Sequence, residues 1–196
     1  MNPYLTAGER AKLESAKVGI LGAGGLGSNV AMHLARAGVK QFLICDFDIV
    51  SESNLNRQFF FRDQVGQKKV EALKANLLRI DDTLEIDIDD RRLDADGVEA
   101  LFADADIIVE ALDKAELKAL CYNIFLKTGK PVVGASGLAG WGRSNEMKVK
   151  KLGNLHIVGD GQTGVDEIMA PQSPRVGIAA AMQANTVVSI ILGAAI

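Results

Sequence analysis

The stretch KVGILGAGGLGSNVAMHLARAG, residues 17–38, decides the fold of this 196-residue chain. It opens with a short apolar run, typical of a buried strand, and passes into closely spaced glycines. Val30 and Leu34 then follow at helical spacing, and Gly38 is a residue that commonly ends a helix. A strand, a glycine turn and a helix in this order predict the first unit of a Rossmann-like fold.

The glycine turn predicts a nucleotide site. Gly22, Gly24 and Gly27 form G-x-G-x-x-G, which allows a tight turn, close approach of a phosphate, and close packing of helix on strand. Gly25 lies at the expected helix start, where N–H groups attract anions. Asp46 ends the next apolar run, the usual place for a carboxylate that binds a ribose hydroxyl. The motif does not distinguish ATP from a dinucleotide.

Apolar runs and helical patterns continue to alternate along the chain. Runs typical of strands occupy 41–48, 83–89, 106–113 and 131–136, and helical patterns occupy 66–80, 96–104 and 114–129. Such alternation predicts an α/β fold with a mostly parallel sheet and helices on both faces. After residue 140 the segments 146–152 and 154–160 read as an antiparallel pair.

We expect one nucleotide-binding domain over residues 1–196. Its parts are an N-terminal helix (1–16), a Rossmann-like core (17–140) and an antiparallel extension (141–196) that also holds a loop and a final helix. Residues 159–175 are rich in Gly, Pro and polar residues, so we expect a mobile loop there.

Composition narrows the classes of function. The net charge of −3 gives no general case for binding nucleic acid or an anionic membrane. Cys45 and Cys121 lie far apart and form no C-x-x-C pair, so neither zinc nor a disulfide is expected, and a cytoplasmic setting fits best. Residues 176–196 carry no charge, but Gln183 and Asn185 interrupt the apolar run. We therefore expect a buried helix there and no membrane span.

The segment SNLNRQFFF, residues 53–61, favours ATP over a dinucleotide. Asn54, Arg57 and Gln58 are spaced i, i+3, i+4, so one helical turn would place them on one side. They follow the second strand and so lie at the carboxyl edge of the sheet, where open α/β sheets bind ligands. Arg57 can bind phosphate oxygens with its fork of N–H groups. The aromatic residues 59–61 are expected to wedge the turn against the domain or a partner subunit.

A second positive charge is expected from Lys69 or its neighbour Lys68, between which the residues alone do not choose. Asp113, at the end of the run 106–113, reaches the same edge and suits Mg²⁺, with Asp48 as a second candidate. The plain alternative for Asp113 is the N-cap of the helix that follows.

A dinucleotide-dependent dehydrogenase is the alternative to ATP chemistry. It normally needs a substrate domain with a proton-transfer residue, and little chain remains for one. His33 lies in a core helical pattern and His156 on a late strand, so both are interpreted as structural.

Together, GAGGLGS (22–28), DFDIVSESNLNRQFF (46–60), VGQKKVEALKANLLRI (65–80) and EALDKAELK (110–118) resemble the ThiF/MoeB superfamily, related to ubiquitin-activating enzymes. The length and the segments GRSN (142–145) and RVGIAAAMQAN (175–185) look most like compact ThiF-type adenylyltransferases of thiamine biosynthesis.

The resemblance implies ATP-dependent adenylation of the C-terminal glycine of a small ubiquitin-like sulfur carrier that ends in Gly-Gly. It also implies a homodimer. By motif, Asp46 corresponds to the ribose-binding aspartate, Lys69 rather than Lys68 to the family lysine, and Asp113 to the aspartate linked to Mg²⁺. Asn54, Arg57 and Gln58 correspond to the phosphate-binding and catalytic set.

The chain also departs from its family. It lacks the two C-x-x-C zinc pairs of larger relatives, and residues 159–175 hold no cysteine, so we expect the reaction to stop at the adenylate. Lys114 follows Asp113 where the family usually has Asn. Family members take an arginine from the partner's N-terminal arm; whether Arg10 serves this role is left open.

The stretch GASGLAGWG, residues 134–142, suggests a channel for a Gly-Gly tail, since bulky side chains are largely absent. An ordinary turn with Trp141 packed beneath it is the alternative. Three other functions stay open: adenylation of another carboxylate, such as a molybdopterin-type carrier, a peptide or a modified tRNA base; a non-catalytic carrier-binding module; and a nicotinamide oxidoreductase.

Overall fold

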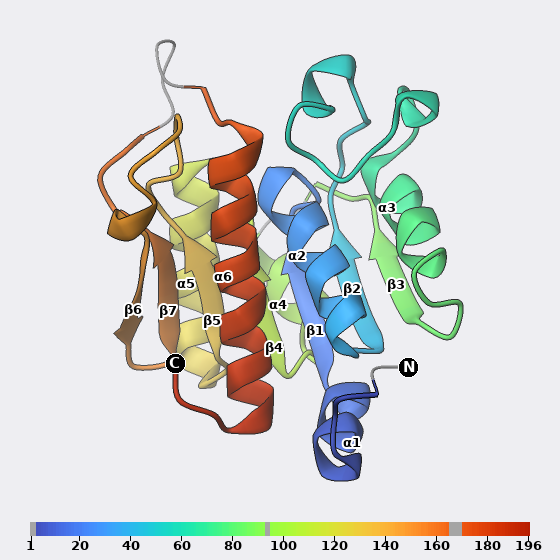
Figure 1. Ribbon diagram of the computed structural model, residues 1–196, viewed down its shortest axis with the longest axis vertical. Helices are drawn as coiled ribbons and strands as arrows, with labels where there is room; N and C mark the ends of the chain where they lie inside the picture. Colours follow the sequence, from blue (N-terminus) through green and yellow to red (C-terminus); the bar gives the residue numbers. More distant parts are fainter. Residues whose placement is uncertain (1–2, 93–94, 165–169) are drawn as a thin grey trace.

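A computed structural model describes residues 3–92, 95–164 and 170–196, and its centre is a seven-stranded sheet in the order β3-β2-β1-β4-β5-β7-β6 (Figure 1). All neighbouring strands run parallel except β6 and β7. The strands are β1 Lys17–Leu21, β2 Gln41–Cys45, β3 Glu85–Asp89, β4 Ile107–Glu110, β5 Val132–Ala135, β6 Lys148–Leu152 and β7 Leu155–Gly159. The helices are α1 Ala7–Ser15, α2 Gly25–Ala37, α3 Lys69–Leu78, α4 Ala95–Leu101, α5 Ala115–Thr128 and α6 Ser173–Leu192.

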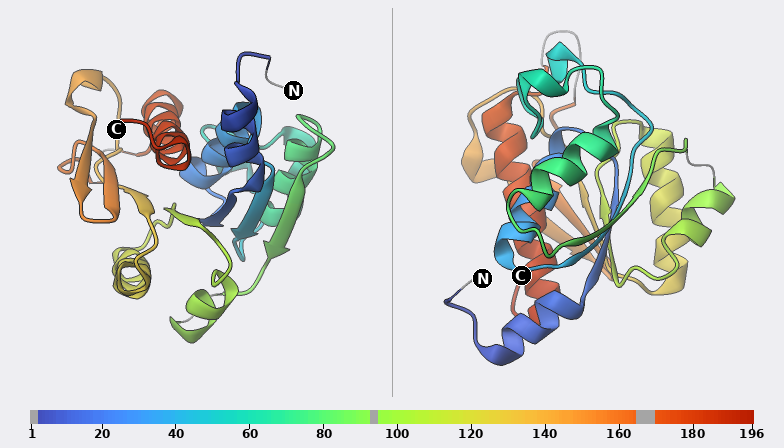
Figure 2. Two further views of the ribbon diagram at one scale, coloured as in Figure 1. Left: turned by 90° about the horizontal axis from the view of Figure 1, so that it is seen from below. Right: turned by 90° about the vertical axis from the view of Figure 1, so that its right-hand side faces the viewer.

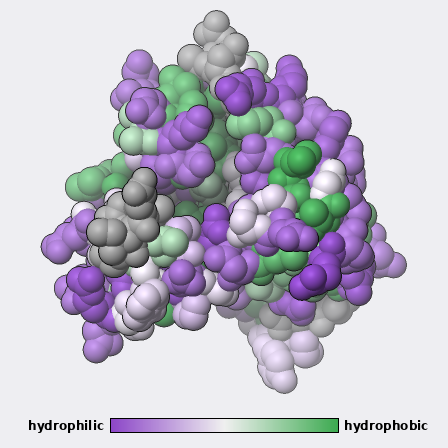
Figure 3. All heavy atoms as spheres, turned by 90° about the horizontal axis from the view of Figure 1, so that it is seen from above, coloured by the Kyte–Doolittle hydropathy of each residue, from purple (hydrophilic) through white to green (hydrophobic). Residues whose placement is uncertain are grey.

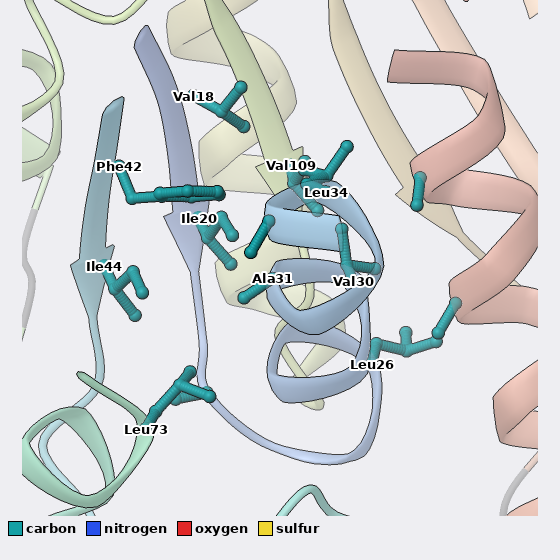
Figure 4. Close-up of a cluster of buried hydrophobic side chains, with 14 of the residues drawn as sticks. Val18, Ile20, Leu26, Val30, Ala31, Leu34, Phe42, Ile44, Leu73 and Val109 are labelled. Atoms are coloured by element: carbon teal, nitrogen blue, oxygen red, sulfur yellow. The ribbon is translucent and has the colours of Figure 1, made fainter. Parts of the chain in front are cut away.

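Helices cover both faces of the sheet, as the alternating pattern predicts. Helices α2, α3 and α6 lie on one face, and α4 and α5 lie on the other (Figure 2). One apolar cluster joins β1 and β2 to α2, α3 and α6, and a second joins the other face to α4 and α5. In the first, the side chains of Ile20 and Phe42 lie close to Ala31 of α2 (Figure 4). The predicted α/β, Rossmann-like class is confirmed.

Two glycines explain why residues 17–38 adopt strand, turn and helix. Gly22 has φ of 97°, a conformation that side chains other than glycine rarely adopt. A Cβ atom at Gly27 would lie 1.8 Å from the carbonyl oxygen of Gly22, so only glycine lets α2 pack this closely on the turn. Gly38 ends α2 in the left-handed conformation, as expected.

Helix α6 is the predicted C-terminal helix. Among the described residues it alone has the length and composition to cross a bilayer. Here it packs against α1, α2, β5 and β7, and Val176, Ala180 and Val187 are buried in the core. The prediction of a core helix is confirmed.

The structure corrects the start of the N-terminal helix and the pairing of the C-terminal strands. The N-terminal helix begins at Ala7, where the side chain of Thr6 accepts a hydrogen bond from Glu9 N and closes a capping box. The antiparallel pair β6–β7 exists, but β7 also pairs in parallel with β5. The extension therefore continues the main sheet, which an alternating pattern alone does not reveal.

A mobile loop was predicted over residues 159–175, and the described part of this segment carries several contacts, with α6 beginning at Ser173. Asp160 accepts hydrogen bonds from the backbone of Gln162 and Thr163 and pairs with buried Arg175. Residues 165–169 lie outside the described residues.

Candidate active site

A cleft of about 1170 Å³ lies over the carboxyl ends of β1, β2, β4 and β5. Loops from these strands form its walls, at the upper end of the molecule in Figure 1. Seen from above, this end is mostly hydrophilic with separate apolar patches (Figure 3). A cleft at this edge is the usual ligand site of an open α/β sheet.

The glycine loop forms one wall. Gly22, Gly24 and Gly25 line the cleft, whereas Gly27 serves the packing described above. Helix α2 begins at Gly25 with no side-chain cap, which leaves its first N–H groups available to an anion. Asp46, also on the cleft, accepts a 2.6 Å hydrogen bond from Ala23 N through Oδ2. The carboxylate and the glycine turn therefore lie side by side.

The turn after β2 brings Asn54, Arg57 and Gln58 to the cleft together. Backbone N–H groups of Arg57 and Gln58 both donate to the carbonyl oxygen of Asn54, which gives the helical turn expected from the spacing. Arg57 Nη1 donates to Ser53 O and Asn56 Oδ1, and among the described residues its Nε and Nη2 have no partner. Arg57 can therefore offer N–H groups to a phosphate.

Gln58 is more unusual, because its side chain is 9% exposed and its Oε1 has no hydrogen-bond partner in the described chain. A buried polar atom without a partner is costly, so it points to a ligand or an ordered water. The neighbouring aromatic residues hold the turn: Phe60 is buried in the core, Phe59 packs against it, and Phe61 is 45% exposed.

The two neighbouring lysines, Lys68 and Lys69, occupy different positions relative to the cleft, although the sequence pattern did not distinguish them. Lys69 is 6% exposed, lines the cleft and pairs with Asp48 at 2.7 Å. Lys68 is exposed and pairs with Asp90, and the cleft does not include it. Geometry therefore favours Lys69 as the site cation.

Asp113 lines the cleft, but not as the end of a strand. Strand β4 stops at Glu110, since Glu110 Oε1 accepts a hydrogen bond from Leu112 N and turns the chain. The N-cap alternative is also wrong: Lys114 holds that position and no side chain caps α5. Asp113 is exposed and has no hydrogen bond or ion pair to other described residues.

The acidic groups alone do not make a metal cage, since no group of three or more His, Cys, Asp or Glu able to hold a metal occurs in the described ranges. Mg²⁺ typically takes one or two carboxylates and completes its shell with phosphates and water. Asp113, which has no partner in the described part of the chain, fits that pattern, while one oxygen of Asp48 already binds Lys69.

Sequence reasoning missed several residues of the cleft. Arg91 and Arg92 follow β3, and Arg92 lies 4.5 Å from the ring centre of Phe47. Their position after a parallel strand was the available signal. Lys118 lies one turn into α5 and binds the fully buried carboxylate of Glu110 at 2.8 Å, a pairing that only the folded chain shows.

Both cysteines line the cleft but are poor nucleophiles. Burial raises the pKa of Cys45 to about 12 and also raises the pKa of Cys121. Both thiols therefore remain protonated at neutral pH. They are free and form no disulfide, as expected.

The wall opposite the glycine loop comes from residues 136–138, Thr163, Gly164 and Pro171. The alternative of an ordinary turn with Trp141 packed beneath it is wrong, because Trp141 is 75% exposed. Gly137, Gly140 and Gly142 all have positive φ, whereas Ala139 between them is buried.

Other predicted or weighed residues lie away from the cleft. His33 is half-buried on α2, and His156 is 4% exposed on β7, consistent with structural roles. Arg10 lies on α1, at the opposite end of the molecule (Figure 1). Within one chain it cannot reach the site.

The model of the ThiF family matches residues 2–196. The chain is 32% identical over 194 residues to "Adenylyltransferase and sulfurtransferase UBA4" of Candida glabrata, covering 93% of this chain and 44% of that protein. It is 40% identical over 116 residues to the molybdopterin-synthase adenylyltransferase of Salmonella typhimurium, covering 57% and 47%. The chain thus spans less than half the length of these curated relatives.

Solved structures agree on the fold. E. coli MccB in complex with ATP is 26% identical with a TM-score of 0.74, covering 93% of this chain and 58% of that one. E. coli tRNA N6-threonylcarbamoyladenosine dehydratase TcdA in complex with ATP has a TM-score of 0.88 at 18% identity, covering 95% and 90%. At that identity the second likeness concerns the fold alone.

Proposed function

The chain belongs to the ThiF family, and from that premise we propose that it is an adenylyltransferase. Its substrates are ATP and the C-terminal carboxylate of a small ubiquitin-like carrier that ends in Gly-Gly. One observation carries the proposal: a single cleft holds the glycine loop, the Asn54–Arg57–Gln58 turn, Lys69 and Asp113. A triphosphate needs more positive charge than the backbone of a glycine loop supplies. The ATP complexes of related structures support the choice of nucleotide.

The chemistry is a displacement at phosphorus without a protein nucleophile. A carrier carboxylate oxygen forms a bond to the α-phosphorus while the bond to the bridging oxygen of the β-phosphate breaks. The products are the carrier acyl-adenylate and pyrophosphate. Arg57 and Lys69 would neutralise charge on the phosphates, and the Gln58 amide and the glycine loop would orient them.

Asp46 would bind the ribose, with Asp48 holding Lys69 in place. Mg²⁺, when bound, would be held by Asp113 together with phosphate oxygens and would neutralise their charge. With Cys45 and Cys121 protonated and no cysteine in the sequence of residues 159–175, the adenylate itself is the proposed product.

Within this activity we propose that the substrate is a sulfur carrier of the ThiS type, so that the enzyme acts in thiamine (thiazole) biosynthesis. We also propose that residues 1–196 form one domain and that the protein is a cytoplasmic homodimer. The compact sequence and its segments 142–145 and 175–185 support this subtype. A molybdopterin-type carrier is the second candidate. The molybdopterin-synthase adenylyltransferase of Salmonella typhimurium is 40% identical to this chain over the matched residues, compared with 32% for UBA4 of Candida glabrata.

Isotope exchange tests the proposal. The protein, ATP, Mg²⁺ and radioactive pyrophosphate are incubated with and without a folded carrier that ends in Gly-Gly. We expect label to enter ATP only when the carrier is present. Absence of exchange with correctly folded carriers of both types would refute carrier adenylation. A parallel binding measurement with NAD⁺ excludes or supports an oxidoreductase.

A further inference from the structure

A buried ion pair lies beside the cleft wall opposite the glycine loop. Arg175, in the first turn of α6, and Asp160, which follows β7, are 1% and 3% exposed and lie 2.5 Å apart. Arg175 Nη1 also donates to the carbonyl oxygen of Gly142 at 2.6 Å. One guanidinium group therefore joins two loops far apart in the sequence.

The carboxylate of Asp160 also makes several other contacts that hold it in place. Its carboxylate accepts hydrogen bonds from Gln162 N, Thr163 N and Thr163 Oγ1. A Cβ atom at Gly137 would lie 1.9 Å from Asp160 Oδ1, so the loop after β5 closes directly onto this carboxylate. Backbone hydrogen bonds from Asp160 N to Gly137 O and from Gly161 N to Ser136 O connect the same two loops.

The segments that the pair joins are the far wall of the cleft. Residues 136–138 line it after β5, and Thr163 and Gly164 line it after β7. The glycine loop and Asp46 lie over β1 and β2, on the other side of β4 in the strand order. The pair thus shapes the half of the cleft that is remote from the proposed ribose and phosphate groups.

Nothing in the energetics of folding requires a charged pair here. Removing two charges from water is costly, and an apolar pair of similar volume is often as stable. The pair contributes fixed geometry, because the planar guanidinium sets both the angles and the distances of the acceptors that it binds.

We propose that Arg175 and Asp160 are positioning residues for the carboxylate substrate. They hold residues 136–142 as one wall along which a glycine-ended peptide tail reaches the α-phosphate, and they do not contact ATP. This inference rests on the proposed adenylyltransferase function. It predicts that disturbing the pair weakens use of the carrier and leaves use of ATP almost unchanged.

Arg175→Lys is the main test, because lysine keeps the positive charge beside Asp160 but cannot bind Asp160 and Gly142 O with one fork. In pyrophosphate exchange we expect the KM for the carrier to rise about tenfold, equal to about 1.4 kcal/mol. The KM for ATP should change less than twofold. An equal rise in both values, or no change in either, would overturn the inference.

Gly137→Ala provides a second route that leaves both charges in place. The new methyl group would push against Asp160 Oδ1, so the same selective rise in carrier KM is expected. Gly153→Ala is the matched control: Gly153 also has positive φ, 61°, but a Cβ there meets nothing within 4 Å, and it lies in the β6–β7 turn. Equal effects of the two substitutions would contradict the inference.

Trp141 gives a readout that needs no activity, because it is the single tryptophan of the chain and lies in the loop that Arg175 holds. Its fluorescence anisotropy should fall in Arg175→Lys while the far-UV circular dichroism stays unchanged. An unchanged anisotropy would show that the pair does not hold the loop. If the wild-type protein gives no exchange with any carrier, the proposed function and its carrier substrate are both refuted. The anisotropy measurement then tests separately whether the ion pair holds the loop in place.

Discussion

At the scale of single residues, the site is a set of groups whose neighbours leave them free for a ligand. Arg57 has open N–H groups, Gln58 has a buried oxygen without a partner among the described residues, and Asp113 has no partner there. Residues whose role is structural differ, since Lys118 and Glu110 satisfy one another. This contrast separates residues proposed to bind substrate from residues that hold the cleft.

Arg57→Ala and Asp113→Ala should each lower the exchange rate by about 10²–10³-fold, the usual cost of removing one group that stabilises charge in a transition state. The melting temperature should stay close to that of the wild type, since neither side chain is in the core. Arg62→Ala is the control, because Arg62 is exposed, lies in the same connection and is not part of the cleft. A variant of Arg57 or Asp113 with full activity would refute its assignment.

Lys69→Ala should remove most of the exchange activity, and Lys68→Ala should leave it nearly unchanged. The reason is position: the Lys69 amine lies at the cleft beside Asp48, whereas Lys68 pairs with exposed Asp90. Steady-state rates of both variants, measured at saturating ATP, decide the question. Similar losses in the two would show that their charge acts at long range and that the cleft position of Lys69 is irrelevant.

At the scale of elements, local pattern predicted most strands and helices but misjudged how they end. The strand expected over 106–113 stops at Glu110, since its carboxylate is occupied by Lys118 and turns the backbone. The pairing of β7 with β5 and the contact of Arg175 with Gly142 join residues remote in sequence. Residue spacing predicts the local turn around Arg57, but it carries no information about contacts between remote residues. The Glu110–Lys118 pair and the Asp160–Arg175 pair were therefore missed.

Gly27→Ala should destabilise the turn between β1 and α2 by about 1–3 kcal/mol, since its methyl group would overlap the carbonyl oxygen of Gly22. Gly177→Ala is the opposite case, because Gly177 is in α6 and a Cβ there meets nothing within 4 Å. Alanine should stabilise that helix by about 0.5–1 kcal/mol. Urea unfolding of both variants measures the two values, and equal signs would contradict the packing argument.

Asp160, in the loop after β7, should make the free energy of unfolding depend on pH in the acid range. Burial alone would raise the pKa of Asp160, but hydrogen bonds from Thr163 and Gln162 and the charge of Arg175 outweigh it and lower the pKa from 3.8 to about 2. The unfolded chain therefore binds a proton first as the pH falls, so this stabilisation is complete above about pH 4 and is lost toward about pH 2. Asp160→Asn should reduce the slope of unfolding free energy against pH in that window. An unchanged slope would show that Asp160 titrates normally.

At the scale of the whole molecule, the cleft joins parts from both sides of the sheet, so a ligand in it should stabilise the fold as a unit. ATP at about 100 times its Kd should add about 2.7 kcal/mol to the free energy of unfolding. NAD⁺ at the same concentration should add little. Thermal unfolding with each nucleotide measures the difference, and a larger shift with NAD⁺ would favour a dehydrogenase.

The central position of α6 has a consequence for how the chain folds during synthesis. Its side chains Val176, Ala180 and Val187 complete the core that α2 and β5 begin, yet residues 173–192 leave the ribosome after all seven strands have been made. Until then the face of α2 that packs against α6 has no cover, and partly made chains of this kind are prone to aggregate. The growing chain should therefore bind chaperones until α6 emerges, and its core should close only after that.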